Sequence, residues 1–133
     1  MDLTKTCKIE GVSEFFPDGK VAVIGTPQSF RILEELEKAT SIRLAMAFCH
    51  LNGWSRFEAP ITKCAGDVYL LTGLDFCQTE PRLLREWDRL STNRRFQPRL
   101  VTTKTGIFHP KVLIVCSPIN AFALVGSGNL SSA

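Results

Sequence analysis

Four polar residues near the end of the chain have the types that phosphodiester chemistry requires. His109 and Lys111 stand two positions apart, and Ser127 and Asn129 repeat that spacing. A neutral imidazole can attack phosphorus and form a covalent phosphohistidine, which divides one difficult displacement into two. An ammonium group, a hydroxyl and an amide can together stabilise the charge on the non-bridging oxygens. These residue types favour a phosphodiesterase centre.

Two glycines flank the serine of this group. Because glycine lacks a Cβ atom, it lets the backbone approach an anion closely and present its N–H groups. We therefore expect catalysis by His109, Lys111 and Asn129, and phosphate binding by Ser127, Gly126 and Gly128.

Both residue pairs lie in segments that are typical of β-strands, at 106–116 and 121–126, with a turn-rich spacer at 117–120. Residues two apart in a strand face the same way, so each pair should share a face. An antiparallel hairpin would bring the two functional ends together. For all four side chains to share one face, the turn needs an odd number of residues or a bulge, and 118–120 offers such a loop.

The preceding chain alternates between strand-like and helix-like segments. We expect strands at 20–25, 41–48, 67–74 and 99–103, a helix at 27–39 and another opening at 79–81. The stretch 51–63 is ambiguous because Pro60 would break or kink a helix there. This order predicts an α/β fold with a mixed β-sheet and helices on both faces. The apolar run 112–115 predicts a central strand covered on both sides.

Length and composition are those of one globular domain. The chain has 133 residues, of which 44% are hydrophobic and 22% charged. We expect a single domain over 1–133, with 1–18 as an arm or edge strand. The chain has no run of about 20 apolar residues that could span a membrane. The N-terminus lacks the profile of a signal peptide, so a cytoplasmic location is expected.

The five cysteines do not form a metal-binding or redox motif. They are widely spaced and contain no C-x-x-C pair, which argues against a zinc knuckle or a thioredoxin-type site. Cys49 and Cys116 lie in apolar runs and are expected to be buried thiols. We expect no metal and no cofactor.

Basic residues concentrate in the segment that leads to His109. Only two acidic residues oppose Arg82, Arg85, Arg89, Arg94, Arg95, Arg99 and Lys104. Such a cluster attracts a polyanion. We expect nucleic acid to contact Arg94, Arg95, Arg99 and Lys104. The alternative is a solvated helix face followed by a basic loop.

The leaving group of the reaction needs a proton donor, which a second imidazole would supply. The other histidine of the chain, His50, is followed by Leu51-Asn52 and does not repeat the H-x-K arrangement. A two-fold homodimer would solve this, with His109 of each chain facing the same phosphate.

Together, the motifs His109-Pro110-Lys111 and Gly126-Ser127-Gly128-Asn129 resemble the HxK…GSxN pattern of the phospholipase D superfamily. The resemblance covers roughly residues 20–133 and is greatest to the bacterial nuclease branch, where one motif per chain is completed by homodimerisation. It implies a phospholipase D-like domain that works without a metal. It also implies that His109 is the nucleophile and that its symmetry mate is the general acid. Lys111 and Asn129 would bind phosphate, with Ser127 in support.

The sequence departs from the family pattern in three places. Cys116 stands where the fuller motif has an aspartate, and the interval from Lys111 to Gly126 is longer than in the compact pattern. Relatives continue into a helix and a later acidic residue that orients the histidine. We therefore expect this segment to be truncated at its C-terminal end, with the orienting carboxylate outside it.

Two other functions use the same residues. The pocket could bind nucleic acid or phosphate without catalysis, or it could cleave a phospholipid. A lipid substrate would favour an apolar rim, whereas the residues that flank this site are mostly basic. The prediction is thus a metal-independent nuclease that acts on nucleic acid, with DNA favoured over RNA.

Overall fold

The computed structural model describes residues 29–127, 129 and 130. The strand expected at 20–25, the segment 1–18 and the candidate residue Gly128 lie outside the described residues. Contacts within the chain separate 1–32 from 33–133. The architecture given below is that of the described part of the larger unit.

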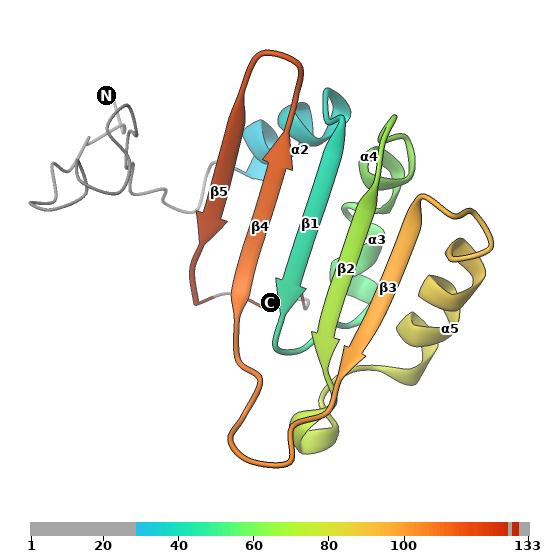
Figure 1. Cartoon of the computed structure of the whole chain (residues 1–133), viewed down its shortest axis with the longest axis vertical. Coiled ribbons are helices and arrows are strands. Elements are labelled where there is room, and N and C mark those ends of the chain that lie inside the picture. The colour runs from blue at the N-terminus through green and yellow to red at the C-terminus, as the bar shows by residue number, and fades with distance from the viewer. Residues whose placement is uncertain (1–28, 128, 131–133) are drawn as a thin grey trace, which may run out of the picture. The chain divides into compact units, whose positions relative to one another are not determined.

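Five strands form one mixed sheet in the order β3-β2-β1-β4-β5 (Figure 1). The strands β1 (Ser41–Met46), β2 (Val68–Gly73) and β3 (Phe96–Val101) are parallel. The strand β4 (Lys111–Cys116) runs antiparallel to β1, and β5 (Ala121–Val125) runs antiparallel to β4. Helical crossovers join the parallel strands, whereas a short turn suffices for the last pair. The predicted α/β class and mixed sheet are confirmed.

Short helices connect the strands and cover one face of the sheet. These helices are α3 (Leu51–Ser55), α4 (Glu58–Thr62) and α5 (Pro81–Leu90), and α2 (Ser29–Glu37) precedes β1. In Figure 1, α3, α4 and α5 lie behind the strands. The rings of Trp54 and Trp87 pack at 5.6 Å and join α3 to α5. Both tryptophans are fully buried, so this contact is part of the core.

Buried and exposed residues alternate along β1, so one face of the sheet packs against the helices and the other does not. Ile42 and Leu44 of β1 are buried against the helices, whereas Arg43 between them is exposed. Tyr69 of β2 pairs with Arg43 and is also exposed. The expectation of helices on both faces is therefore wrong for residues 33–127, because no described helix covers the second face, on which polar and apolar side chains lie side by side.

The same alternation corrects two smaller predictions about β4. The run 112–115 was expected to be covered on both sides, yet only Leu113 and Val115 are buried. Cys116 faces the open side and is half-buried. The other thiol predicted to be buried, Cys49, is fully enclosed.

The ambiguous stretch 51–63 forms two helices with a break before Glu58. Pro60 is the third residue of α4. The first turn of a helix has no intrahelical partner for its N–H groups, so a proline is tolerated there. The strand expected at 99–103 begins earlier, at Phe96, and includes Pro98. Because β3 is an edge strand, the missing N–H of this proline costs no ladder hydrogen bond.

The hairpin between β4 and β5 has a register different from the one expected. Cys116 pairs with Ala121, which leaves four residues in the turn instead of an odd number. The N–H of Ser117 donates to the carbonyl of Asn120 at 2.7 Å and closes it. An even turn places odd-numbered residues of β4 and β5 on opposite faces. Ser127 and Asn129 therefore do not reach His109 by simple continuation of the hairpin.

Candidate active site

His109 and Lys111 lie at one end of the sheet, where β1 ends and β4 begins. Lys111 is the first residue of β4 and pairs with Met46, the last residue of β1. The N–H of Ala47 donates to the carbonyl of Pro110 at 2.8 Å. This edge also carries the ends of β2 and β3 (Figure 1). In open sheets of this kind, ligands bind outside the carboxyl ends of the parallel strands.

The side chains of His109 and Lys111 are in direct contact. The Lys111 Nζ atom lies 2.9 Å from Nδ1 and 3.3 Å from Nε2 of the imidazole. An ammonium group only donates hydrogen bonds, so the ring nitrogen that accepts must be unprotonated. An attack on phosphorus requires a ring nitrogen with a free lone pair. His109 is exposed and Lys111 is half-buried, so a substrate can reach the pair.

Two further residues, which the sequence did not single out, position the histidine. The ring of Phe48 packs edge-on against the imidazole, with 5.6 Å between centroids and an interplanar angle of 76°. The carboxylate of Asp75 accepts a 2.8 Å hydrogen bond from the N–H of Phe108, the residue before His109. Both lie just beyond the end of a parallel strand. That position is the signal in the sequence that could have identified them.

Asn129 reaches the same edge by a different route from the one predicted. After β5, the N–H of Gly126 still donates to the carbonyl of Lys111 at 3.2 Å. The chain then leaves the hairpin, and Leu130 forms a parallel bridge with Cys49, just beyond β1. Asn129 is thereby held beside the segment that carries Phe48. Ser127 is exposed and makes no side-chain hydrogen bond to any described residue.

The amide of Asn129 has an unsatisfied atom. Its Oδ1 atom is buried and has no hydrogen-bond partner among the residues described. Buried polar atoms are nearly always paired, so an orphan at a candidate site needs an explanation. This oxygen is enclosed and can only accept a hydrogen bond, so the group of Asn129 that could donate to a phosphate oxygen is its Nδ2 amide.

His50 lies close to this segment but has its own partner. Its Nε2 atom is 2.8 Å from the carbonyl of Gln78, so this nitrogen carries the proton. Its backbone N–H donates to the carbonyl of Leu130 at 2.7 Å. No hydrogen bond between His50 and His109 occurs in the described structure. The expectation that the second imidazole comes from another chain therefore stays a prediction.

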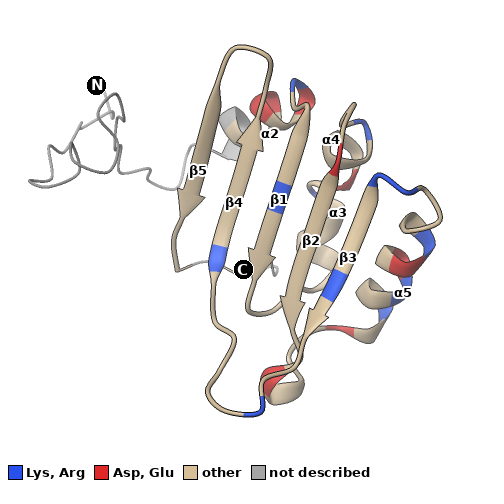
Figure 2. Cartoon of the chain, viewed as in Figure 1, with Lys and Arg blue, Asp and Glu red and all other residues tan. Residues whose placement is uncertain are grey.

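The four basic residues expected to contact nucleic acid do not lie together. Arg94 and Arg95 precede β3, at the end of the sheet opposite to the end that carries His109. Arg95 donates to the carbonyl of Cys64 and lies over the ring of Phe96, so it stabilises a loop. Lys104 follows β3, in the loop that leads to His109. Figure 2 shows basic residues at both ends of the sheet and on its open face.

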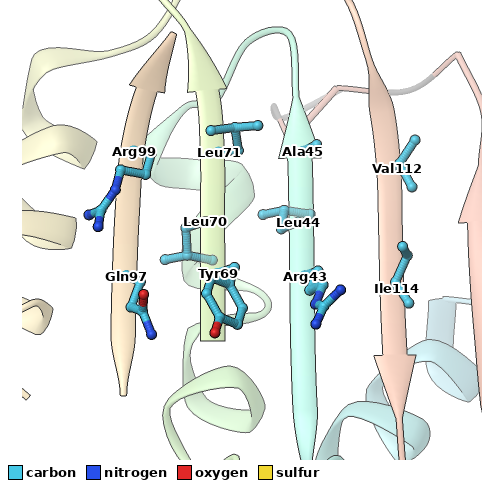
Figure 3. A pocket seen from close by; sticks show the side chains of 10 residues that line it. All are labelled: Arg43, Leu44, Ala45, Tyr69, Leu70, Leu71, Gln97, Arg99, Val112 and Ile114. Atoms are coloured by element: carbon cyan, nitrogen blue, oxygen red, sulfur yellow. The ribbon is translucent and has the colours of Figure 1, made fainter. Parts of the chain in front are cut away.

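Arg99, the fourth of these residues, points into a shallow hollow on the open face of the sheet. The hollow has a volume of about 490 Å³. Figure 3 shows its lining, in which Arg99 and Gln97 of β3 lie beside Tyr69 and Arg43. The guanidinium of Arg43 stands 5.4 Å from the centroid of the Tyr69 ring. His109 does not line this hollow, so Arg99 lies apart from the candidate site. Of the four basic residues, Lys104 is the one that lies at the same end of the sheet as His109.

Within the described chain, no three His, Cys, Asp or Glu side chains are grouped so that they could hold a metal ion. No described helix has the length and apolar character needed to cross a membrane. No protein-family model matches the sequence, and the search of curated proteins found no significant match.

Proposed function

We propose that this chain is a metal-independent phosphodiesterase that cleaves nucleic acid through a covalent intermediate on His109. The observation that carries the proposal is the contact between the Lys111 ammonium and the imidazole, 2.9 Å from Nδ1. It supports the proposal because a cation that could bind a phosphate lies beside an exposed imidazole. Asn129 is brought to the same edge by the bridge between Leu130 and Cys49.

The reaction has two displacements at phosphorus. In the first, a ring nitrogen of His109 attacks, the bond from phosphorus to the leaving oxygen breaks, and that oxygen takes a proton from a general acid. In the second, water attacks phosphorus and gives a proton to the group that acted as the acid, the bond from phosphorus to the ring nitrogen breaks, and the imidazole returns to its free form. Lys111 and the amide of Asn129 stabilise the charge on the non-bridging oxygens in both steps. Phosphate binding by Gly126 and Ser127 stays a prediction.

The general acid is His109 of the partner subunit in a two-fold homodimer. One imidazole attacks phosphorus as the nucleophile and the other donates a proton to the leaving oxygen. The resemblance to the one-motif nucleases of the phospholipase D superfamily supports this arrangement. A dimer has a mass close to twice 14.8 kDa, which light scattering on the purified chain measures directly.

The substrate is nucleic acid, with DNA favoured over RNA. The net charge of +3 and the position of Lys104 support a polyanionic substrate. Cleavage of single-stranded and double-stranded DNA and RNA is measured in excess chelator, which also tests whether a metal is needed. We expect His109→Ala to lower the rate by at least about 10⁴-fold. His50→Ala, the matched control, should retain activity.

A radiolabelled substrate quenched in alkali tests the intermediate directly. We expect label on His109, stable to base and lost in acid. Chelator-resistant cleavage that survives in His109→Ala would refute the proposed nucleophile.

A second candidate is a phosphate-binding module without catalysis. One observation favours it, because the described structure shows no carboxylate hydrogen-bonded to His109, whose recorded polar contact is with Lys111. A nucleophilic imidazole usually has a partner that fixes its tautomer. Binding without cleavage, with an affinity that falls steeply as salt rises, would identify this function.

A further inference from the structure

An exposed phenylalanine occupies a strained turn beside the candidate active site. Phe76 lies in the 3₁₀ turn Asp75–Cys77 (η2) that follows β2, and 64% of it is exposed. Its backbone is left-handed, with φ 58° and ψ 12°, and the next residue, Cys77, has φ 52°. Two consecutive non-glycine residues in this region are unusual because the Cβ atom meets the backbone there.

This turn is fixed to the loop that carries the candidate nucleophile. Asp75 accepts hydrogen bonds from the N–H of Phe108 at 2.8 Å and from the Thr103 hydroxyl at 3.5 Å. The turn and the residue before His109 are therefore positioned together. Local backbone strain that the surrounding structure maintains is typical of functional sites.

Three rings form a row that leads out from the candidate nucleophile. The ring of Phe48 packs against the imidazole of His109 at 5.6 Å and against the ring of Phe76 at 6.3 Å. These two spacings place the Phe76 ring no more than about 12 Å from the imidazole. That distance corresponds to a few nucleotides, at about 3.4 Å per stacked nucleotide.

A single exposed apolar residue usually needs no explanation. Ile119 is such a case, since it is 97% exposed and lies in the turn at the opposite end of β4. Phe76 differs because it combines exposure with backbone strain, with anchoring through Asp75 and with a place in the row of rings.

We propose that Phe76 is a stacking platform for an unpaired nucleobase within a few nucleotides of the scissile phosphate. The proposal rests on the proposed function and makes it more specific, because the preferred substrate is then single-stranded nucleic acid. Every base has a face that can stack on an aromatic ring, so this contact does not require a particular sequence. A paired base inside a duplex offers no free face.

The test compares two fluorescent oligonucleotides of equal length and charge, one of thymidines and one with abasic sites throughout. Anisotropy gives Kd for the wild-type chain and its variants, each with His109→Ala added so that the strands stay intact during the measurement. Phe76→Ala should weaken binding of the thymidine strand by about 5- to 100-fold and leave the abasic strand unchanged. Phe76→Tyr should keep the affinity, and Ile119→Ala, the control, should match the wild type on both strands.

Equal affinity of Phe76→Ala and wild type for the thymidine strand would overturn the platform. An equal loss on both strands would also overturn it, because the effect would then be independent of the base. Binding is measured without cleavage, so the result separates the two proposals. If Phe76→Ala loses affinity for the thymidine strand alone and the chain cleaves nothing, the platform is supported and the nuclease is refuted. If the chain cleaves nucleic acid and Phe76→Ala leaves Kd and KM unchanged, the nuclease is supported and the platform is refuted.

Discussion

Removing the Asp75 carboxylate should both destabilise the fold and displace the candidate nucleophile. The bond from the Phe108 N–H to Asp75 is 2.8 Å long and partly buried. A hydrogen bond to a charged group contributes about 1.5–3 kcal/mol. The contact with Thr103, at 3.5 Å, is at the limit of a hydrogen bond and adds little. We expect Asp75→Ala to cost about 2 kcal/mol, which corresponds to a fall in Tm of roughly 5–10 °C.

The same change should slow catalysis more than it weakens binding. Phe108 directly precedes His109, and a displacement of about 1 Å at a reacting group can reduce the rate by about 100-fold. Thermal denaturation and single-turnover cleavage of a single-stranded oligonucleotide measure the two effects. Asp75→Asn keeps one acceptor oxygen and should lie between Asp75→Ala and the wild type.

Asp67→Asn is the matched control. Asp67 is exposed, precedes β2 and makes no side-chain hydrogen bond within the described structure. If Asp75→Ala melts at the same temperature as this control, the hydrogen bond to Phe108 does not stabilise the fold. If its Tm falls but the cleavage rate is unchanged, Asp75 does not position His109.

Three further predictions test the site and the core. Lys111→Met should lower kcat by about 10²- to 10³-fold, with partial recovery in Lys111→Arg, and rates equal to the wild type would exclude a role in charge stabilisation. Burial raises the pKa of Cys49 from 9.0 to about 12, so at pH 8 iodoacetamide should modify the exposed Cys77 and spare Cys49, as peptide mass mapping will show. The Cys49 thiol ionises at a lower pH in the unfolded chain than in the folded one. Its contribution to the free energy of unfolding is therefore complete below pH 9.0 and should be lost as the pH rises towards 12. Gly66→Ala would place a Cβ atom 2.0 Å from the carbonyl oxygen of Thr40, so we expect a loss of about 1–3 kcal/mol in chemical denaturation, and an unchanged midpoint would contradict this packing.

Local patterns in the sequence were sufficient to predict most of the helices and strands. The helix predicted to open at 79–81 is α5, which begins at Pro81 and buries Leu83 and Trp87. The apolar run of β4 predicted a strand, although this strand begins at Lys111 and not at 106. The spacing of His109 and Lys111 indicated that their side chains lie together, and they are in contact. These features depend on residues within a few positions of one another, so the sequence alone contains them.

The grouping of residues at the site depends on the order of the strands. Because β1 lies between β2 and β4, Phe48 reaches His109 although 61 positions separate them in the chain. The even turn between β4 and β5 sets a register that the pattern of apolar residues did not reveal. Asn129 reaches the edge only because Leu130 pairs with Cys49.

The chain by itself determined the chemical types in the two motifs, the alternating elements and the mixed sheet. Only the tertiary structure decided which side chains meet, that one face of the described sheet is open, and that Arg95 and Lys104 lie at opposite edges. The physical reason is that helix and strand preferences act over a few residues, whereas strand order and register depend on burying side chains from distant segments in one core.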